Sequence, residues 1–293
     1  MLADARDDTL TRDLESKEQH LLAQFRGVAS LIVAYSGGTD SAYLAWAAHR
    51  ALGDRALAVT ADSPSYPRSH RTLAEQVAVG AGFAHRFVDT AEMRDPRYQQ
   101  NPVNRCYYCK SELFSVLEQL RTELGFDAVA YGINLDDTHD FRPGHQAADE
   151  HRVLAPLRDA GLTKAEIRAL SRRAGLASAD VPASACLSSR IPYGMEVTPA
   201  KLEQIDRAED ALRGLGFRQV RVRHHGDLAR IELAPDELPT ALDPERVRLM
   251  SRALHELGFR FVSLDLDGYR QGALNEVLQI LPGPAAGRGH ADG

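Results

Sequence analysis

Up to about residue 175, short apolar runs alternate with segments in which apolar residues recur every three or four positions. The first pattern is typical of strands and the second of amphipathic helices. The apolar runs predict strands at 28–35, 55–62, 84–90 and 126–134, and we expect a further strand at 153–157. The helical spacing predicts helices at 1–26, 41–53, 69–82, 106–125 and 163–175. Strands separated by crossover helices predict an α/β fold, with a parallel sheet that carries helices on both faces.

A different pattern begins after residue 194. Helical spacing recurs at 199–216 and 244–258, and strands are predicted at 218–226, 228–234 and 260–266. The alternation in the first two of these strands is typical of half-buried, antiparallel pairing. We therefore expect an α/β domain at 1–194, a smaller α+β domain at 195–282, and a disordered tail rich in Gly, Ala and Pro at 283–293.

The charge balance and the ends of the chain narrow the class of protein. The 293 residues include 35 Lys and Arg and 41 Asp and Glu, a formal net charge of −6. Because binding to a phosphate backbone needs a basic surface, this balance argues against nucleic acid as a partner. The apolar run at 31–35 is too short to cross a bilayer, and the charged N-terminus does not resemble a signal peptide. We expect a cytoplasmic protein without a membrane segment.

The segment Ser36-Gly37-Gly38-Thr39-Asp40-Ser41 stands where a strand should end and a helix begin. Two adjacent glycines allow a tight turn that directs successive N–H groups into one concavity, and the helix adds its positive N-terminal end. The hydroxyls of Ser36 and Ser41 can donate to phosphate oxygens, and Asp40 can cap the helix or approach a phosphate-bound Mg²⁺. The motif predicts phosphate binding; the alternative is an ordinary turn with a Ser or Asp cap.

The chain has three cysteines, and two of them form a C-x-x-C motif. An odd count of this kind indicates a reducing compartment with metal or thiol chemistry instead of a disulfide framework. Cys106 and Cys109 lie on one face of the predicted helix, so both can reach one metal site, to which Cys186 could add a third thiolate. The alternatives are three neutral packed thiols, or a zinc site that lacks a fourth cysteine.

Several segments, taken as a set, resemble the LarE family of the PP-loop ATP pyrophosphatases. They are AYSGGTDSAYLA, TADSPSYP, NPVNRCYYCKSELF, YGINLDD, RPG, PASACLSSRIPYG and VRVRHHGDLARIEL. The resemblance implies that residues 1–194 form a PP-loop domain and that ATP adenylates the carboxylates of a pyridinium bis-carboxylate mononucleotide. Sulfur would then displace AMP and leave a thiocarboxylate for the nickel-pincer nucleotide, with Mg²⁺ neutralising the departing pyrophosphate. It also implies a homo-oligomer whose partners are small molecules.

The same resemblance gives two expectations for the source of sulfur. Cys186 stands where the well-known form of the family has a cysteine that gives up its own sulfur. Together, Cys106, Cys109 and Cys186 resemble a subtype in which three thiolates hold a [4Fe-4S] cluster and leave one iron open for hydrosulfide. The cluster would make sulfur delivery renewable, whereas the single cysteine would be consumed.

The resemblance also points to residues that contact ATP. Asp62 and Ser63 end the second predicted strand, where enzymes of this type hold adenosine; the alternative is a turn into the next helix. Asn134, with Asp136 or Asp137, ends a later strand and is expected to position ATP or Mg²⁺.

Three arginines are candidates for the mononucleotide. Arg221 and Arg223 alternate along a strand and therefore point to one face, where two guanidinium groups suit a phosphate. The alternative is a solvated strand face. Arg190 follows the Cys186 segment and could bind a phosphate or carboxylate. Glu232 could contact a metal or the substrate, but we expect it to be an exposed strand residue.

Two other functions compete with this interpretation. A cluster-dependent tRNA thiolase would combine the same phosphate loop with three cysteines, but the acidic charge and the lack of zinc-ribbon cysteine pairs argue against it. A nucleotide-binding module without catalysis would require the cysteine set to be incidental.

Overall fold

The computed structural model describes residues 2–139, 143–182 and 185–270. The chain divides into two compact units. The first comprises Met1–Ser188 and Tyr193–Glu203, and the second Ser189–Pro192 and Gln204–Gly293. The predicted domain boundaries stay predictions, and the predicted tail at 283–293 lies outside the described residues.

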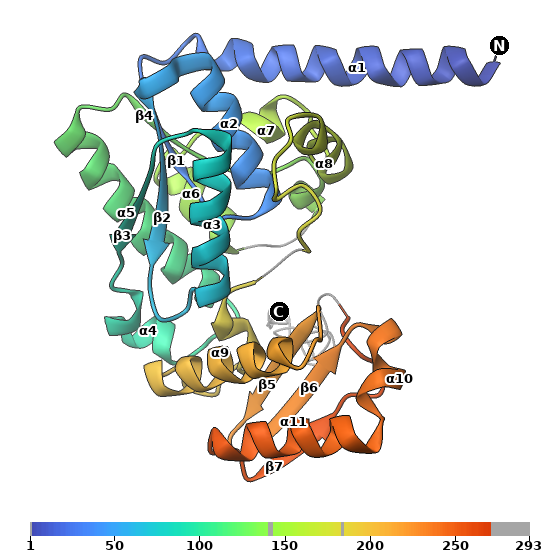
Figure 1. Ribbon diagram of the computed structural model, residues 1–293. Coiled ribbons are helices and arrows are strands. Elements are labelled where there is room, and N and C mark those ends of the chain that lie inside the picture. Colours follow the sequence, from blue (N-terminus) through green and yellow to red (C-terminus); the bar gives the residue numbers. More distant parts are fainter. Residues whose placement is uncertain (1, 140–142, 183–184, 271–293) are drawn as a thin grey trace, which may run out of the picture. The chain divides into compact units, whose positions relative to one another are not determined.

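The first unit is built on a four-stranded sheet in the order β3-β2-β1-β4, and every pair of neighbours is parallel (Figure 1). Its strands are β1 (Leu31–Ala34), β2 (Ala56–Asp62), β3 (His85–Asp89) and β4 (Ala128–Tyr131). The predicted parallel sheet is therefore confirmed. Because parallel strands end at one edge, the segments that follow β1, β2 and β4 lie at the same side of the sheet.

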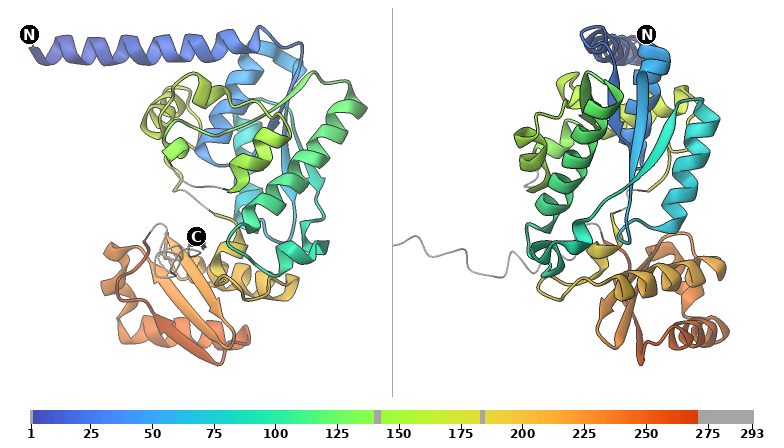
Figure 2. Two further views of the ribbon diagram at one scale, coloured as in Figure 1. Left: turned by 180° about the vertical axis from the view of Figure 1, so that it is seen from behind. Right: turned by 90° about the vertical axis from the view of Figure 1, so that its left-hand side faces the viewer.

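Helices cover both faces of this sheet, as the alternation along β1 requires. Leu31 and Val33 belong to one apolar core, and Ile32 belongs to the other. The helices of the first core are α1 (Leu2–Phe25), α2 (Thr39–Leu52), α3 (Arg68–Ala81), α7 (Pro156–Asp159) and α8 (Lys164–Arg173). Those of the second core are α5 (Arg105–Leu124) and α6 (Pro143–Glu150). Figure 2 shows α3 and α5 on opposite sides of the sheet.

The expected strand at 153–157 is wrong. Leu154 forms only a single bridge to Ala130 beside β4, and helix α7 begins at Pro156. Proline suits the first position of a helix because its fixed φ is already helical and it lacks an N–H to satisfy. The expected start of α8 is confirmed, since Thr163 and Glu166 form a reciprocal capping box.

The second unit contains a three-stranded sheet in the order β5-β6-β7. The strands are β5 (Val220–His225), β6 (Leu228–Leu233) and β7 (Phe261–Leu264). The long helices are α11 (Pro244–Glu256) and α9 (Pro199–Gly214), of which residues 199–203 belong to the first unit. β5 and β6 pair antiparallel as predicted, whereas β7 runs parallel to β6. Apolar side chains of the sheet, α9 and α11 form one core. The predicted combination of an α/β sheet with a smaller α+β region is confirmed.

Short helices and 3₁₀ turns lie between the longer helices and strands. They are α4 (Pro96–Gln99), α10 (Leu238–Ala241) and the 3₁₀ turns η1 (Gly53–Arg55), η2 (Glu92–Arg94), η3 (Asp136–His139), η4 (Leu187–Arg190) and η5 (Pro235–Glu237). Within the described ranges, none of the helices combines the length and the apolar character that crossing a bilayer requires.

Candidate active site

The loop between β1 and α2 has the backbone that its two glycines predict. Gly37 has a φ of 75°, and a Cβ there would lie 3.1 Å from the Ala74 Cβ, so glycine is needed on both counts. Gly38 has an extended backbone and is the N-cap of α2, and no side chain in the described structure caps that end. The alternative of a Ser- or Asp-capped turn is therefore not formed. The first N–H groups of α2 stay available to an anion.

Two hydroxyls close the loop. The Ser36 and Ser41 Oγ atoms lie 3.1 Å apart, and Ser41 Oγ also accepts from the Ser36 N–H at 3.1 Å. Ser41 Oγ can donate to the Gly38 carbonyl, again at 3.1 Å. The two hydroxyls thus lie beside the uncapped helix end, in a position to donate to a phosphate.

Asp40 links the loop to a residue that the sequence reasoning missed. Its Oδ2 accepts from Lys164 Nζ at 2.6 Å and from Asn134 Nδ2 at 3.4 Å. Its Oδ1 is buried and has no hydrogen-bond partner among the described residues. Burial raises the pKa of Asp40, while the Lys164 ammonium opposes that shift. A buried carboxylate oxygen without a partner fits the ligand set of Mg²⁺, which prefers such oxygens.

Asn134 organises the segment after β4. Its Oδ1 accepts from the N–H groups of Asp136 and Asp137 at 2.9 and 3.2 Å. Asp136 Oδ2 in turn accepts from the Lys164 N–H at 2.9 Å. The structure therefore brings Asp40, Asn134, Asp136 and Asp137 together with the start of α8. The Thr163 cap placed Lys164 in the first turn of a helix, but no sequence signal showed that it reaches Asp40.

Gly132, directly after β4, is a second residue to which the sequence analysis assigned no function. A Cβ there would lie 2.9 Å from the Ser41 backbone N and 3.0 Å from its Cα. Real side chains do not approach backbone so closely, so Gly132 lets the end of β4 pack against the start of α2. This contact holds the phosphate loop beside the Asn134 segment.

The end of β2 connects this edge with the cysteines. Asp62 pairs with Arg71 of α3 and is half exposed. Ser63 Oγ lies 2.9 Å from Ser65 Oγ, and Ser65 Oγ donates to Glu92 at 3.3 Å. The Ser65 carbonyl accepts from the Leu187 N–H at 2.8 Å, next to Cys186. The predicted adenosine position and the cysteine segment are thus joined by hydrogen bonds within the first unit.

All three cysteines belong to the first unit and none forms a disulfide. Burial is the main cause that raises the pKa of Cys109, and a neighbouring Cys186 raises it further. Cys106 reaches solvent, but the protein around it and the nearby Cys186 raise its pKa as well. Cys186 therefore lies within electrostatic range of both Cys106 and Cys109, and their common metal site stays a prediction. Within the part of the chain that the structure describes, no group of three or more His, Cys, Asp or Glu side chains is arranged to hold a metal ion.

The Cys186 segment is anchored two residues further on. Ser188 Oγ lies 2.6 Å from the Tyr98 hydroxyl, and the Ser188 carbonyl accepts from Arg105 Nη1 at 3.0 Å. Tyr98 and Arg105 are both buried. These contacts fix the chain that follows Cys186 against α4 and α5.

The arginines of the second unit lie in its interior. Arg190 and Glu209 are both fully buried, and their two hydrogen bonds measure 2.8 and 3.1 Å. Arg223 donates to Glu232 at 2.9 and 2.6 Å. Glu232 is only 1% exposed, so the expectation of an exposed strand residue is wrong. Its carboxylate faces inward because it neutralises Arg223.

The two buried Arg–Glu pairs affect the prediction that these arginines bind the phosphate of the mononucleotide. Arg221 and Arg223 are buried, so the solvated strand face is also wrong. The guanidinium of Arg223 is bound by Glu232 and the Ser189 carbonyl, and that of Arg190 by Glu209. Burial and the nearby Arg190 lower the pKa of Arg221 to about 10. Ligand-binding roles for the three arginines stay predictions, and the buried pairs of Arg190 and Arg223 argue against theirs.

Known proteins provide an independent comparison. No family model matches the chain. An uncharacterised protein of Synechocystis is 44% identical over 265 residues, which cover 90% of this chain and 99% of that protein. The pyridinium-3,5-bisthiocarboxylic acid mononucleotide synthase of Lactiplantibacillus plantarum is 35% identical over 267 residues, 90% of this chain and 96% of that enzyme. This chain belongs to the LarE family.

An uncharacterised protein of Methanocaldococcus jannaschii is also similar, with 28% identity over 171 residues, 58% of this chain and 66% of that protein. The resemblance of the motifs to the LarE family is confirmed, because the match to the synthase runs through nearly the whole chain. The three-cysteine subtype stays a prediction, since overall identity does not test individual cysteines.

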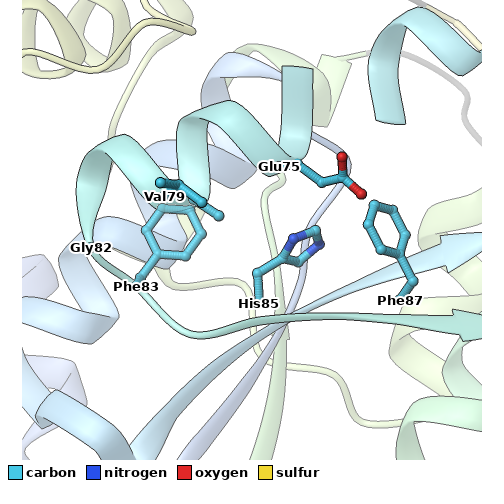
Figure 3. A pocket seen from close by; sticks show the side chains of 7 residues that line it. Glu75, Val79, Gly82, Phe83, His85 and Phe87 are labelled. Carbon is cyan, nitrogen blue, oxygen red and sulfur yellow. The ribbon is translucent and has the colours of Figure 1, made fainter. Parts of the chain in front are cut away.

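An open pocket lies elsewhere in the first unit, between α3 and the edge strand β3 (Figure 3). The His85 ring stands between Phe83 and Phe87, with Glu75 above it. The lining residues are Glu75, Ala78, Val79, Gly82, Phe83, His85 and Phe87. None of them is a predicted site residue, so the pocket adds nothing to the candidate active site.

Proposed function

We propose that this LarE-family protein is an ATP-dependent sulfur transferase of nickel-pincer cofactor synthesis. Its substrate would be pyridinium-3,5-biscarboxylic acid mononucleotide, whose carboxylates become thiocarboxylates. The kinship with the bisthiocarboxylic acid mononucleotide synthase supports an enzyme of sulfur transfer. The observation that carries the use of ATP is the uncapped start of α2 at Gly38, flanked by the hydroxyls of Ser36 and Ser41.

The first step would be activation of a carboxylate. A carboxylate resists attack by sulfur because its oxygen is a poor leaving group. Attack of that oxygen on the α-phosphorus of ATP forms an acyl adenylate and breaks the bond to pyrophosphate. The N–H groups at Gly38 and the two hydroxyls would hold the departing phosphates. Mg²⁺, when bound at the free Oδ1 of Asp40, would offset their charge.

The second step would be sulfur transfer. A sulfur nucleophile attacks the acyl carbon and expels AMP, which keeps the oxygen that the carboxylate brought. Cys106, Cys109 and Cys186 would hold a [4Fe-4S] cluster, which supplies an open iron for hydrosulfide. Beyond the effect of burial, Cys186 raises the pKa of both Cys106 and Cys109, which supports a common site for the three thiols. The alternative is that Cys186 gives up its own sulfur.

The phosphate loop, the end of β2 and the three cysteines all belong to the first unit. Ser65 bonds through its side chain to Ser63 and Glu92, and through its carbonyl to Leu187 beside Cys186. An adenylate at the end of β2 would therefore form close to the cysteine segment. This connection favours a single site for adenylation and sulfur attack.

Pyrophosphate release tests the proposal. Full-length protein is incubated anaerobically with sulfide, ATP, Mg²⁺ and the mononucleotide, and pyrophosphate is counted against thiocarboxylate by mass spectrometry. We expect one pyrophosphate for each sulfur introduced, and none without the mononucleotide. Release of ADP and phosphate instead would contradict adenylation, and sulfur found only on added tRNA would favour the thiolase.

A further inference from the structure

We propose that Arg105 forms an anion-binding position in the cysteine site and holds a small sulfur anion, such as hydrosulfide, beside Cys106. This inference rests on the proposed function in one respect only, namely that the three cysteines form the sulfur site. It assigns a role to a side chain that neither the motifs nor the phosphate loop account for.

The first observation is the surroundings of the Arg105 side chain. It is only 4% exposed. Its Nη1 donates to Asn101 Oδ1 and to the Ser188 carbonyl, and its guanidinium lies near the Cys106 thiol. The guanidinium carbon lies 6.0 Å from the centre of the Tyr193 ring. Among the described residues these partners are neutral groups and thiols, and no carboxylate pairs with Arg105.

The second observation is the contrast with two other buried arginines, Arg190 and Arg223. Arg190 pairs with Glu209 and Arg223 with Glu232, in each case through two hydrogen bonds. An isolated charge in a protein interior is costly unless a counter-charge is present. Arg105 therefore needs an anion that no carboxylate among the described residues provides. The groups beside it that can supply or hold one are sulfur atoms.

The other charges around the cysteines point the same way. Lys110 adds a second cation near Cys106 and Cys109. Glu92 is the facing acid; it lies near Cys109, and its buried Oε2 has no hydrogen-bond partner in the described structure. Two cations against one carboxylate leave a positive field at the thiols.

A ratio of two alkylation rates tests the proposal. Iodoacetate is anionic and iodoacetamide is neutral, and both attack the thiolate, so their rate ratio at one pH cancels the thiolate fraction. The full chain is reduced, freed of bound iron with a chelator, and the labelling of Cys106 is followed by peptide mass spectrometry. Removing a charge a few ångströms away should lower the ratio about tenfold in Arg105→Gln. Arg105→Lys keeps the charge and should keep the ratio within about twofold.

Arg97→Gln is the matched control. Arg97 lies in α4, is exposed, pairs with Asp95 at 2.8 Å and stacks on Tyr108, so it shares the neighbourhood without being buried. Its removal should leave the ratio unchanged. A folded Arg105→Gln protein with an unchanged ratio would overturn the proposal, and so would an equal drop in Arg97→Gln.

A measurement on the unaltered protein covers the case in which Arg105→Gln does not fold. Thiocyanate, a stable sulfur anion, should slow iodoacetate labelling of Cys106 more than chloride does at equal ionic strength. Equal slowing by both salts would also overturn the proposal. These readouts need neither ATP nor mononucleotide, so a failure here is distinct from a failure of ATP-dependent thiocarboxylate formation.

Discussion

The two units of this protein bury their charges in different ways. In the second unit, Arg190 and Arg223 each lie against a buried glutamate, and no water or ligand is needed to complete the pair. In the first unit, Arg105 has no carboxylate partner among the described residues, and Asp40 keeps one buried oxygen without a hydrogen bond. Charges that the fold itself completes are structural. Of these four charges, the two that the fold leaves incomplete lie at the phosphate loop and at the cysteines, where a ligand would complete them.

The largest expected effect is the loss of turnover when a cysteine of the first unit is replaced. If Cys106, Cys109 and Cys186 hold a cluster, replacing any one with alanine should abolish turnover and the brown colour together, since the ligands act as a unit. Iron and sulfide are counted after anaerobic purification. If only Cys186→Ala is inactive and spent protein carries dehydroalanine at that position, the sulfur comes from Cys186 and the cluster is wrong.

The buried pairs of the second unit should matter for stability. Glu209→Ala leaves Arg190 buried without a counter-charge, which should cost about 3–5 kcal/mol in the free energy of unfolding. Asp210→Ala is the control on the same helix, because Asp210 pairs with Arg213 at the surface and such pairs contribute about 0–1 kcal/mol. Urea denaturation compares the two variants. Similar losses would mean that burial does not distinguish these charges.

The two loop glycines should separate binding from folding. A Cβ at Gly38 meets only Ser36 Oγ, at 3.5 Å, so Gly38→Ala should fold normally yet occupy the phosphate concavity. Pyrophosphate release should fall about tenfold or more, as for the loss of one charge-assisted contact. Gly37→Ala should instead lower the free energy of unfolding by about 1–2 kcal/mol because its φ is left-handed. A Gly38→Ala enzyme with normal activity would remove the loop from the phosphate site.

The smallest effect is a shift in pH dependence. Lys164 lowers the pKa of Asp40, which burial raises. Removing the ammonium in Lys164→Met should raise that pKa further, so a higher pH is needed to ionise the Mg²⁺ ligand. The acid limb of the profile of pyrophosphate release against pH should therefore move upward. Arg168→Met, on the same helix α8, is the control, and a limb that moves equally in both variants would contradict this role for Lys164.

Periodicity predicted most elements because strands and helices bury their apolar residues at different spacings. The phosphate loop could be located for a similar reason, since Gly37 and Gly38 mark a local backbone requirement. Lys164 could not be found, because its partner Asp40 stands 124 positions earlier in the chain. The predicted exposure of Glu232 was wrong for the same reason, because its partner Arg223 lies on the neighbouring strand. Whether a charged residue is buried can be predicted only when its counter-charge is known. The pairing of strands and helices in the fold determines that partner, and the local sequence does not.

Oxygen-18 in the carboxylates of the mononucleotide tests the central claim most directly. Adenylation followed by sulfur attack breaks the acyl carbon–oxygen bond, so one labelled oxygen must leave with AMP for every sulfur introduced. Mass spectrometry of the nucleotide products should therefore show labelled AMP in equal amount to thiocarboxylate. Unlabelled AMP, or label in inorganic phosphate alongside ADP, would contradict an acyl adenylate and with it the proposed sulfur transfer.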